Sequence, residues 1–203
     1  MANVDRPQGL VPVGYLNGAP WTGGGRVYCI PNTDDSNAYA IGDPVDIAGG
    51  SDGNGVATIT LATAGTGNGI LGAIVAGAGA LSYGGQYGVP ADTPVVIPAV
   101  KSRDYYVLVA DDPNIIFEVQ EEDGGTAFAA TEVGLNANLM AGTNNGYIST
   151  WEIDTASPAV TATLQVRLLG LSQGRWATNA FGDWAKWLVF INNHRYRIGQ
   201  VGI

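Results

Sequence analysis

Closely spaced turn signals are the feature of this sequence that most constrains its fold. Thirty of the 203 residues are glycine, about twice the usual fraction. Six of these glycines follow Asn or Asp, and such pairs supply the positive φ angles that tight hairpin turns require. A chain interrupted this often favours short β-strands over long helices. The Asn-Gly pairs lie at 17–18, 54–55, 68–69 and 145–146, and the Asp-Gly pairs at 52–53 and 123–124.

The segments between the turns have the composition of short strands. They are rich in Val, Ile, Thr and Tyr, and several alternate between apolar and polar residues. Short helices are expected only at 126–131 and 176–187. The sequence therefore predicts an all-β protein, with a single β-sandwich, jelly-roll-like or small barrel domain. The expected strands are 26–30, 44–48, 56–62, 70–75, 93–100, 105–110, 115–120, 160–169 and 187–192.

The first 25 residues differ from the rest of the chain. Pro7, Pro12 and Pro20 break any helix, yet the segment carries seven large apolar side chains, too many for a solvated linker. We expect an extended N-terminal arm over residues 1–25, ordered by packing on its own domain or on a neighbour. A β-rich domain over residues 26–203 follows the arm.

Charge is scarce and unevenly distributed. Acidic residues outnumber basic ones 18 to 9, for a net charge of −9, which opposes binding to nucleic acid or to an anionic membrane surface. Residues 155–203 hold five bases and one acid, whereas residues 1–154 hold four bases and seventeen acids. Either the two parts pair within the molecule, or the basic end meets an acidic partner.

Residues 53–91 contain no charged residue. Two explanations are open: another subunit covers this surface, or glycine and threonine loops solvate it. The single cysteine, Cys29, excludes an internal disulfide, and the N-terminus lacks the pattern of a secretory signal, so we expect folding in a reducing cell interior. The longest apolar stretch, at 70–81, is shorter than the roughly 20 residues of a membrane-spanning helix.

Two glycine motifs match enzyme signatures in letters but not in context. Residues 49–53 fit G-x-S-x-G around Ser51, with the lone His194 far downstream, but a turn and a strand follow where a nucleophile elbow needs a helix. Residues 67–72 fit G-x-G-x-x-G without the helix that a dinucleotide site requires. We interpret the first motif as a hairpin loop, and Gly67 and Gly69 as a hairpin turn.

Two acidic groups are candidates for chemistry. Asp34, Asp35, Asp43 and Asp46 lack the spacing of a calcium loop and are interpreted as solvated side chains. The second group could supply the pair of carboxylates that glycoside hydrolysis uses. Nothing in the sequence, however, provides the apolar pocket that would raise the pKa of one of the two. This group is interpreted as surface acidity on the open face of an edge strand, or as a contact patch. Its members are Glu118, Glu121 and Glu122, with Asp111, Asp112 and Asp123 nearby.

Aromatic residues gather near the C-terminus. Trp176, Trp184 and Trp187, with Phe181 between them, suit either stacking on sugar rings or a subunit interface. With one histidine and one cysteine, the sequence has too few side chains to favour a zinc site or a catalytic Cys–His pair. We therefore assign no catalytic, cofactor-binding or metal-binding residue.

Several segments together, spread over nearly the whole chain, resemble the head decoration or cement proteins of tailed bacteriophages. None of them encodes chemistry, and their specificity lies in their combination and order. They are MANVDRP at 1–7, GYLNGAPW at 14–21, YVLVADDP at 106–113, FEVQE at 117–121, VGLNA at 133–137, ATLQVRLLGL at 162–171 and AKWLVFINNH at 185–194.

The resemblance implies a non-enzymatic virion protein, made in the host cytoplasm and placed on the outer surface of the phage head. Such proteins are β-rich and commonly trimeric, so the expected partners are the major capsid protein and further copies of this chain, without nucleic acid, membrane or cofactor. The alternative is a tail or fibre protein that binds carbohydrate through Trp176 and Trp184. We expect the arm to make the subunit and capsid contacts, through Val4, Arg6, Leu10, Val13, Tyr15 and Trp21.

Overall fold

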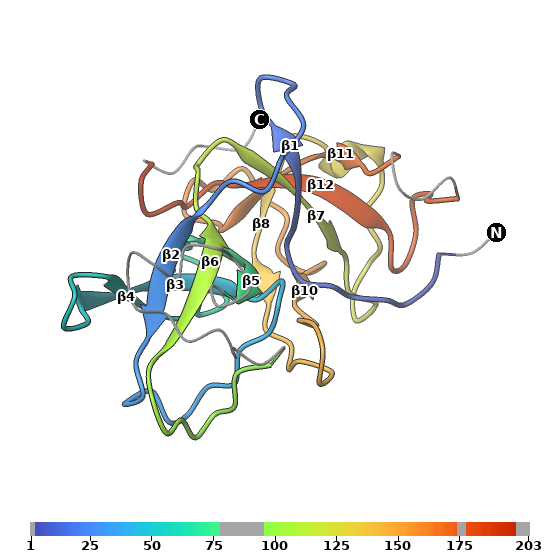
Figure 1. Ribbon diagram of the computed structural model, residues 1–203. Coiled ribbons are helices and arrows are strands. Elements are labelled where there is room, and N and C mark those ends of the chain that lie inside the picture. Colours follow the sequence, from blue (N-terminus) through green and yellow to red (C-terminus); the bar gives the residue numbers. More distant parts are fainter. Residues whose placement is uncertain (1–2, 78–95, 174–177, 198–203) are drawn as a thin grey trace.

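The computed structural model describes residues 3–77, 96–173 and 178–197 (Figure 1). Within these ranges the regular structure is almost entirely β, so the expected all-β class is confirmed. The only helical element of the described part is a 3-10 turn at Ala130–Glu132 (η2), where a short helix was expected at 126–131. At 178–185 the chain is irregular up to the start of a strand, so the helix expected at 176–187 is wrong there.

Five strands close into a small barrel. Its order is β2-β4-β3-β5-β6, and all neighbours run antiparallel except β2 and β4, which are joined through the single parallel pair Cys29–Thr58. Its interior is aliphatic and tyrosine-rich, with Tyr28, Ile59 and Val109 all buried. The strands are β2 (Arg26–Ile30), β3 (Pro44–Ser51), β4 (Ala57–Leu61), β5 (Gly72–Gly77) and β6 (Tyr105–Ala110).

A second, antiparallel sheet lies beside the barrel (Figure 1). Its order is β1-β7-β12-β11-β8, and a two-stranded ribbon of β9 and β10 lies next to β7. The larger of the hydrophobic cores joins this sheet to the barrel and includes Phe117, Trp151 and Trp187. The strands are β1 (Val11–Tyr15), β7 (Ile115–Gln120), β8 (Asn136–Ala137), β9 (Leu139–Met140), β10 (Glu152–Ile153), β11 (Val166–Leu171) and β12 (Lys186–Ile191).

Much of the expected arm is part of this sheet. Strand β1 pairs with β7, and the chain then folds back so that Tyr15 N–H donates to Ala19 O at 2.9 Å. Leu10 is fully buried in the core, against which Trp21 packs. Residues 9–21 are therefore ordered by packing on their own domain. Residues 3–8, which we call the N-terminal strap, have no regular secondary structure and run along the outside of the sheet.

Burial within the chain explains the lack of charge in the strands of residues 53–77, and the exposed positions between them are glycine, asparagine and threonine. These residues form β4, β5 and the connecting loop, and Ile59, Ile70 and Leu71 are completely buried. A Cβ at Gly72 would lie 2.2 Å from Ala110 O, so the close approach of β5 to β6 requires glycine there. No covering subunit is needed for this part of the uncharged run. Residues 78–91 lie outside the described ranges.

The loop at 62–71 joins the barrel to the second sheet. Strands β4 and β5 lie on either side of β3, so this loop cannot be a hairpin, and the hairpin turn expected at Gly67 and Gly69 is wrong. The loop instead crosses to the other sheet, where Gly67 N–H donates to Thr163 O at 2.9 Å and Ile70 N–H donates to Asn193 O at 3.0 Å.

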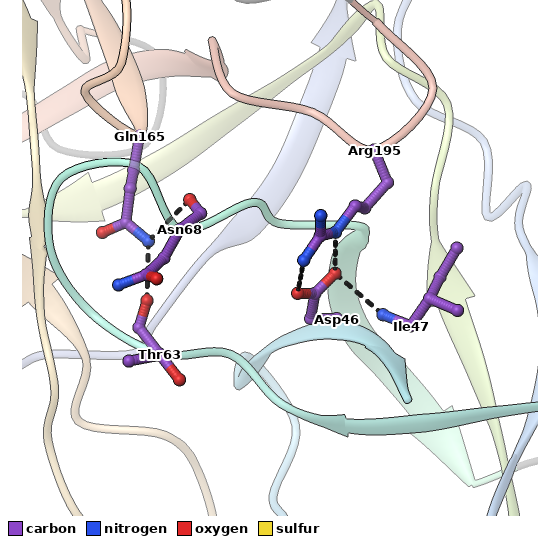
Figure 2. Close-up of polar contacts among 6 residues, drawn as sticks. All are labelled: Asp46, Ile47, Thr63, Asn68, Gln165 and Arg195. Atoms are coloured by element: carbon purple, nitrogen blue, oxygen red, sulfur yellow. Dashed lines mark hydrogen bonds and ion pairs between the residues drawn. The ribbon is translucent and has the colours of Figure 1, made fainter. Parts of the chain in front are cut away.

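One buried amide fastens this loop. Gln165, just before β11, is completely buried, and its Nε2 donates to Thr63 O at 2.9 Å and to Asn68 O at 3.4 Å (Figure 2). Its Oε1 accepts Gly65 N–H at 2.9 Å and Leu139 N–H at 3.1 Å. Both donor and both acceptor positions of the amide are thus satisfied, as burial of a polar group requires.

An ion pair lies beside this junction. Arg195, which follows β12, holds the carboxylate of Asp46 on β3 through two nitrogens (Figure 2). A Cβ at Gly69 would lie 2.8 Å from this guanidinium, so the loop passes closely over it. The basic C-terminal part therefore pairs with the acidic part of the same molecule at this position.

We predict that Gln165→Ala destabilises the protein by about 2–4 kcal/mol, because the buried loop groups lose their hydrogen-bond partners. Denaturant unfolding followed by tryptophan fluorescence measures this change. The control is Gln173→Ala at an exposed position, which should shift stability by less than about 0.5 kcal/mol. Equal effects of the two substitutions would contradict the role given to Gln165.

Candidate functional site

The N-terminal strap covers a buried polar cluster on the second sheet. Lys186 on β12 lies directly opposite Gln120 on β7, and Leu188 lies opposite Glu118. Glu118 and Gln120 alternate with core residues and therefore share the other face of β7. This face is not open: the exposed fractions are 3% for Glu118 and 1% for Gln120. The interpretation of Glu118 as surface acidity on an edge strand is wrong, because β7 lies between β1 and β12 and the strap covers it.

The side-chain amide of Gln120 is the centre of the cluster. Its Nε2 donates to Glu152 Oε1 on β10 at 2.7 Å and to Asp5 Oδ1 of the strap at 2.9 Å. Its Oε1 accepts Arg6 N–H at 2.9 Å and also a proton from Lys186 Nζ. The strap, β7, β10 and β12 therefore meet at a single amide group.

Lys186 and Glu152 have shifted pKa values in this setting. Burial lowers the pKa of Lys186 to about 8, against the opposing effect of the carboxylates of Glu118, Glu152 and Asp5. Burial likewise raises the pKa of Glu152. Lys186 Nζ also donates to Arg6 O at 2.5 Å, which ties the ammonium group to the strap backbone.

Two further carboxylates of the predicted acidic group are also buried. Glu121 is completely buried and accepts Trp187 Nε1–H at 2.7 Å and Phe128 N–H at 3.3 Å. Burial raises the pKa of Glu121 to about 7. Glu122 accepts the Thr155 hydroxyl proton. These carboxylates fasten loops to the sheet, so the surface interpretation is wrong for them as well.

Beside the cluster, the strap borders a cleft of about 250 Å³. Asn3 fixes the start of the strap to the loop before β12, since its Nδ2 donates to Ala180 O at 2.8 Å and to Asp183 O at 3.1 Å. Val4 is 60% exposed here, and Trp184 adopts a φ of 60°, rare for a residue other than glycine. The lining residues are Asn3, Val4, Arg6, Thr178, Asn179, Trp184 and Lys186.

The six expected contact residues divide into three groups. Val4 and Arg6 are exposed on the strap. Val13, Tyr15 and Trp21 are half-buried, and the Trp21 indole N–H donates to Gly24 O at 3.0 Å. Leu10 has no accessible surface and serves the core of this domain, so its assignment as a contact is not compatible with this conformation.

Ser51 and His194, weighed together for hydrolysis, lie on different elements of the fold. Ser51 lies in the β3–β4 hairpin, where Asp52 N–H donates to Val56 O, so the hairpin interpretation of this motif is confirmed. His194 is buried after β12, and its Nδ1 accepts Tyr196 N–H at 3.0 Å. The two side chains belong to separate parts of the fold.

The aspartates weighed as calcium ligands have other partners. Asp34 accepts bonds from Asn37 and Tyr39, Asp43 accepts Ala40 N–H at 2.7 Å, and Asp46 binds Arg195. In the described ranges, no group of three or more His, Cys, Asp or Glu side chains is placed to hold a metal ion.

The aromatic residues near the C-terminus do not form one exposed platform. Trp187 is fully buried and packs edge-on against Phe128, with 5.5 Å between the ring centroids. Phe181 is 47% exposed, and Trp184 borders the cleft. Trp176 lies outside the described residues.

In the described part of the chain, no helix has the length and hydrophobicity needed to cross a membrane.

We predict that Glu121→Gln changes how stability depends on pH. The pKa of Glu121 is about 7 in the folded protein and ordinarily 4.5, so parent stability falls as pH rises through this interval. The difference corresponds to about 3 kcal/mol. Because glutamine does not titrate, the variant should gain about that much relative to the parent between pH 4.5 and pH 8.

Unfolding curves at a series of pH values test this expectation. Asp123→Asn, at an exposed position two residues away, is the matched control and should show a nearly constant difference from the parent. A Glu121→Gln difference that also stays constant with pH would contradict the buried-carboxyl account.

Comparisons with known proteins add no family assignment. No protein-family model, no curated protein and no solved structure matches this chain.

Proposed function

We propose that this protein is a non-enzymatic structural protein of a bacteriophage head, which decorates the outer surface and cements neighbouring major capsid subunits. The observation that carries the proposal is the N-terminal strap. It belongs to the first segment of the resemblance, and it presents Val4 and Arg6 at an exposed cleft although the cluster beneath holds it firmly. A fixed strap with free side chains binds a partner without a large loss of conformational entropy.

The chemistry of the cleft favours a protein partner. Val4 and Trp184 offer apolar surface, and Arg6 is exposed beside them. Aromatic and Arg side chains are enriched among residues that dominate protein interfaces. An acidic loop of a capsid subunit, flanked by an apolar residue, fits this surface.

The architecture also suits a cementing role. A clamp that binds only the assembled shell stabilises it by mass action, and many copies on one shell act together. Most of the potentially reactive groups discussed above are bonded within the fold, such as Glu121 to Trp187 and Asp46 to Arg195. We further propose that the working form is a homotrimer, as the resemblance implies.

Carbohydrate binding is less well supported. Sugar recognition needs free planar polar groups beside an aromatic ring. In the cleft, the Asn3 amide donates to the backbone at 180–183, and Asn179 Nδ2 donates to Ser172 O and Lys186 O. The Asn3 and Asn179 amides, which would have to bind sugar hydroxyls, already donate to backbone carbonyl groups.

We predict that Val4→Asp and Arg6→Glu lower binding to isolated heads at least tenfold, because each places a carboxylate where apolar surface or a cation is needed. Point variants are preferred to deletion of residues 1–21, since that deletion also removes β1 and Leu10. Binding is measured by co-sedimentation with heads of the encoding phage prepared without this protein.

Val100→Asp is the matched control, because Val100 is 78% exposed and lies away from the strap. It should bind like the parent. If the parent fails to bind heads, the proposed function is wrong. If the parent binds and the Val4 and Arg6 variants bind equally well, the contact surface is wrong.

A further inference from the structure

The buried cluster brings an amine and an amide side chain together across two strands. Lys186 and Gln120 are a directly opposed pair in the antiparallel β12–β7 ladder, and both side chains lie on the face that the strap covers. Lys186 Nζ bonds to the side-chain oxygen of Gln120, so the amine lies against the carbonyl group. The exposed fractions are 8% for Lys186 and 1% for Gln120, which keeps bulk water away.

The groups around the Gln120 amide are those that acyl transfer requires. Arg6 N–H, 2.9 Å from Oε1, can stabilise negative charge that develops on this oxygen. The nitrogen that would leave, Nε2, donates to Glu152 Oε1 at 2.7 Å and to Asp5 Oδ1 at 2.9 Å, so a carboxyl group lies within reach of proton transfer. An amine, a donor to the carbonyl oxygen and a carboxyl group beside the leaving nitrogen therefore converge on one amide.

We propose that Lys186 and Gln120 join in an intramolecular amide cross-link, with the Glu152 carboxyl group transferring the proton. Neither the proposed capsid binding nor the choice of partner enters this inference. The reaction needs no cofactor and no oxidant, because it exchanges one amide nitrogen for another.

The step balances as follows. Unprotonated Lys186 Nζ attacks Cδ of Gln120, and the new C–N bond forms as the Cδ–Nε2 bond breaks. A proton from Nζ passes through the Glu152 carboxyl group to Nε2, which leaves as ammonia. In net terms, a lysine ammonium and a primary amide yield a secondary amide and an ammonium ion, and nothing is oxidised or reduced.

The site supports both the start and the end of this reaction. The lowered pKa of Lys186 makes the unprotonated amine accessible near neutral pH, and the raised pKa of Glu152 favours its acid form. After the reaction, the new carbonyl oxygen keeps Arg6 N–H as its donor. The new N–H keeps Arg6 O as its acceptor, so the product leaves these buried backbone groups satisfied.

The other lysine of the chain shows what a purely structural buried lysine is like. Lys101 is 7% exposed, and its Nζ donates to the backbone carbonyls of Asp34, Asn37 and Ala99. None of these acceptors is a side-chain amide with a carboxyl group at its nitrogen. The arrangement at Lys186 is therefore specific to that site, and Lys101 provides a matched control.

Mass spectrometry of the intact protein tests the proposal. The parent, held folded at pH 8, should become lighter by one ammonia, about 17 Da. Proteolysis should then give one branched peptide that contains both residue 120 and residue 186. Glu152→Gln keeps the side-chain size and a hydrogen bond to Gln120 but cannot transfer the proton, so it should retain the full mass. Lys186→Arg keeps the charge and should also retain the full mass.

Lys101→Arg should lose ammonia as the parent does. A parent that keeps the full mass after prolonged incubation at pH 8 overturns the proposal, whatever the variants do. Loss of ammonia that persists in Lys186→Arg overturns it too, since another group would then be reacting. Because the readout is a covalent mass, a variant that folds less stably does not obscure the result for the parent.

Discussion

The buried amide of Gln165 is the contact on which the arrangement of the two β-units depends. The barrel loop at 62–71 and the second sheet both carry buried or partly buried backbone groups at their junction. An unpartnered buried backbone group costs about 1–3 kcal/mol. The Gln165 side chain bonds four backbone groups, of which Leu139 N–H is buried and the three groups of the loop are partly buried. The larger core includes Ala62 and Ile70 from this loop, so the loop must be seated for that core to be complete.

The same principle explains the N-terminal strap. Residues 3–8 have no strand partner, and hydrogen bonds to Gln120 and Lys186 hold them on the sheet. Buried ionisable groups are tolerated there because most of their polar atoms have partners. The strap in turn holds Val4 and Arg6 in fixed positions at the cleft. The buried hydrogen bonds of Gln120 and Lys186 thus give residues 3–8 a defined position on the sheet.

The sequence predicts the strands of the barrel well, but it leaves open whether they form a sandwich, a jelly roll or a barrel. Strands at 26–30 and 105–110 appear with the expected bounds, because β-branched and aromatic runs between turn signals fit a half-buried pleated surface. Strand β1 was not expected, because Pro12 and Gly14 argue against a strand. The register shift between these two residues accommodates them at the sheet edge. Strands β8, β9 and β10 are two residues long each, too short to show a period.

The polar cluster could not be predicted from the same patterns. Alternation at 117–120 shows that the two faces of β7 differ, but it does not show what covers the polar face. Here the strap and β10 cover it, and both are distant in sequence. One signal was available: Lys186 lies between Ala185 and Trp187 in an otherwise apolar strand, which is typical of a buried cation with partners.

The central claim is that this protein decorates the phage head and binds the shell through the strap. A cryo-EM reconstruction of the complete virion, at a resolution that shows side chains, tests it most directly. The account predicts density for this barrel and sheet on the outer surface of the head, with Val4 and Arg6 against a major capsid subunit. Density for this fold on the tail or inside the head, or its absence from the virion, would contradict the account.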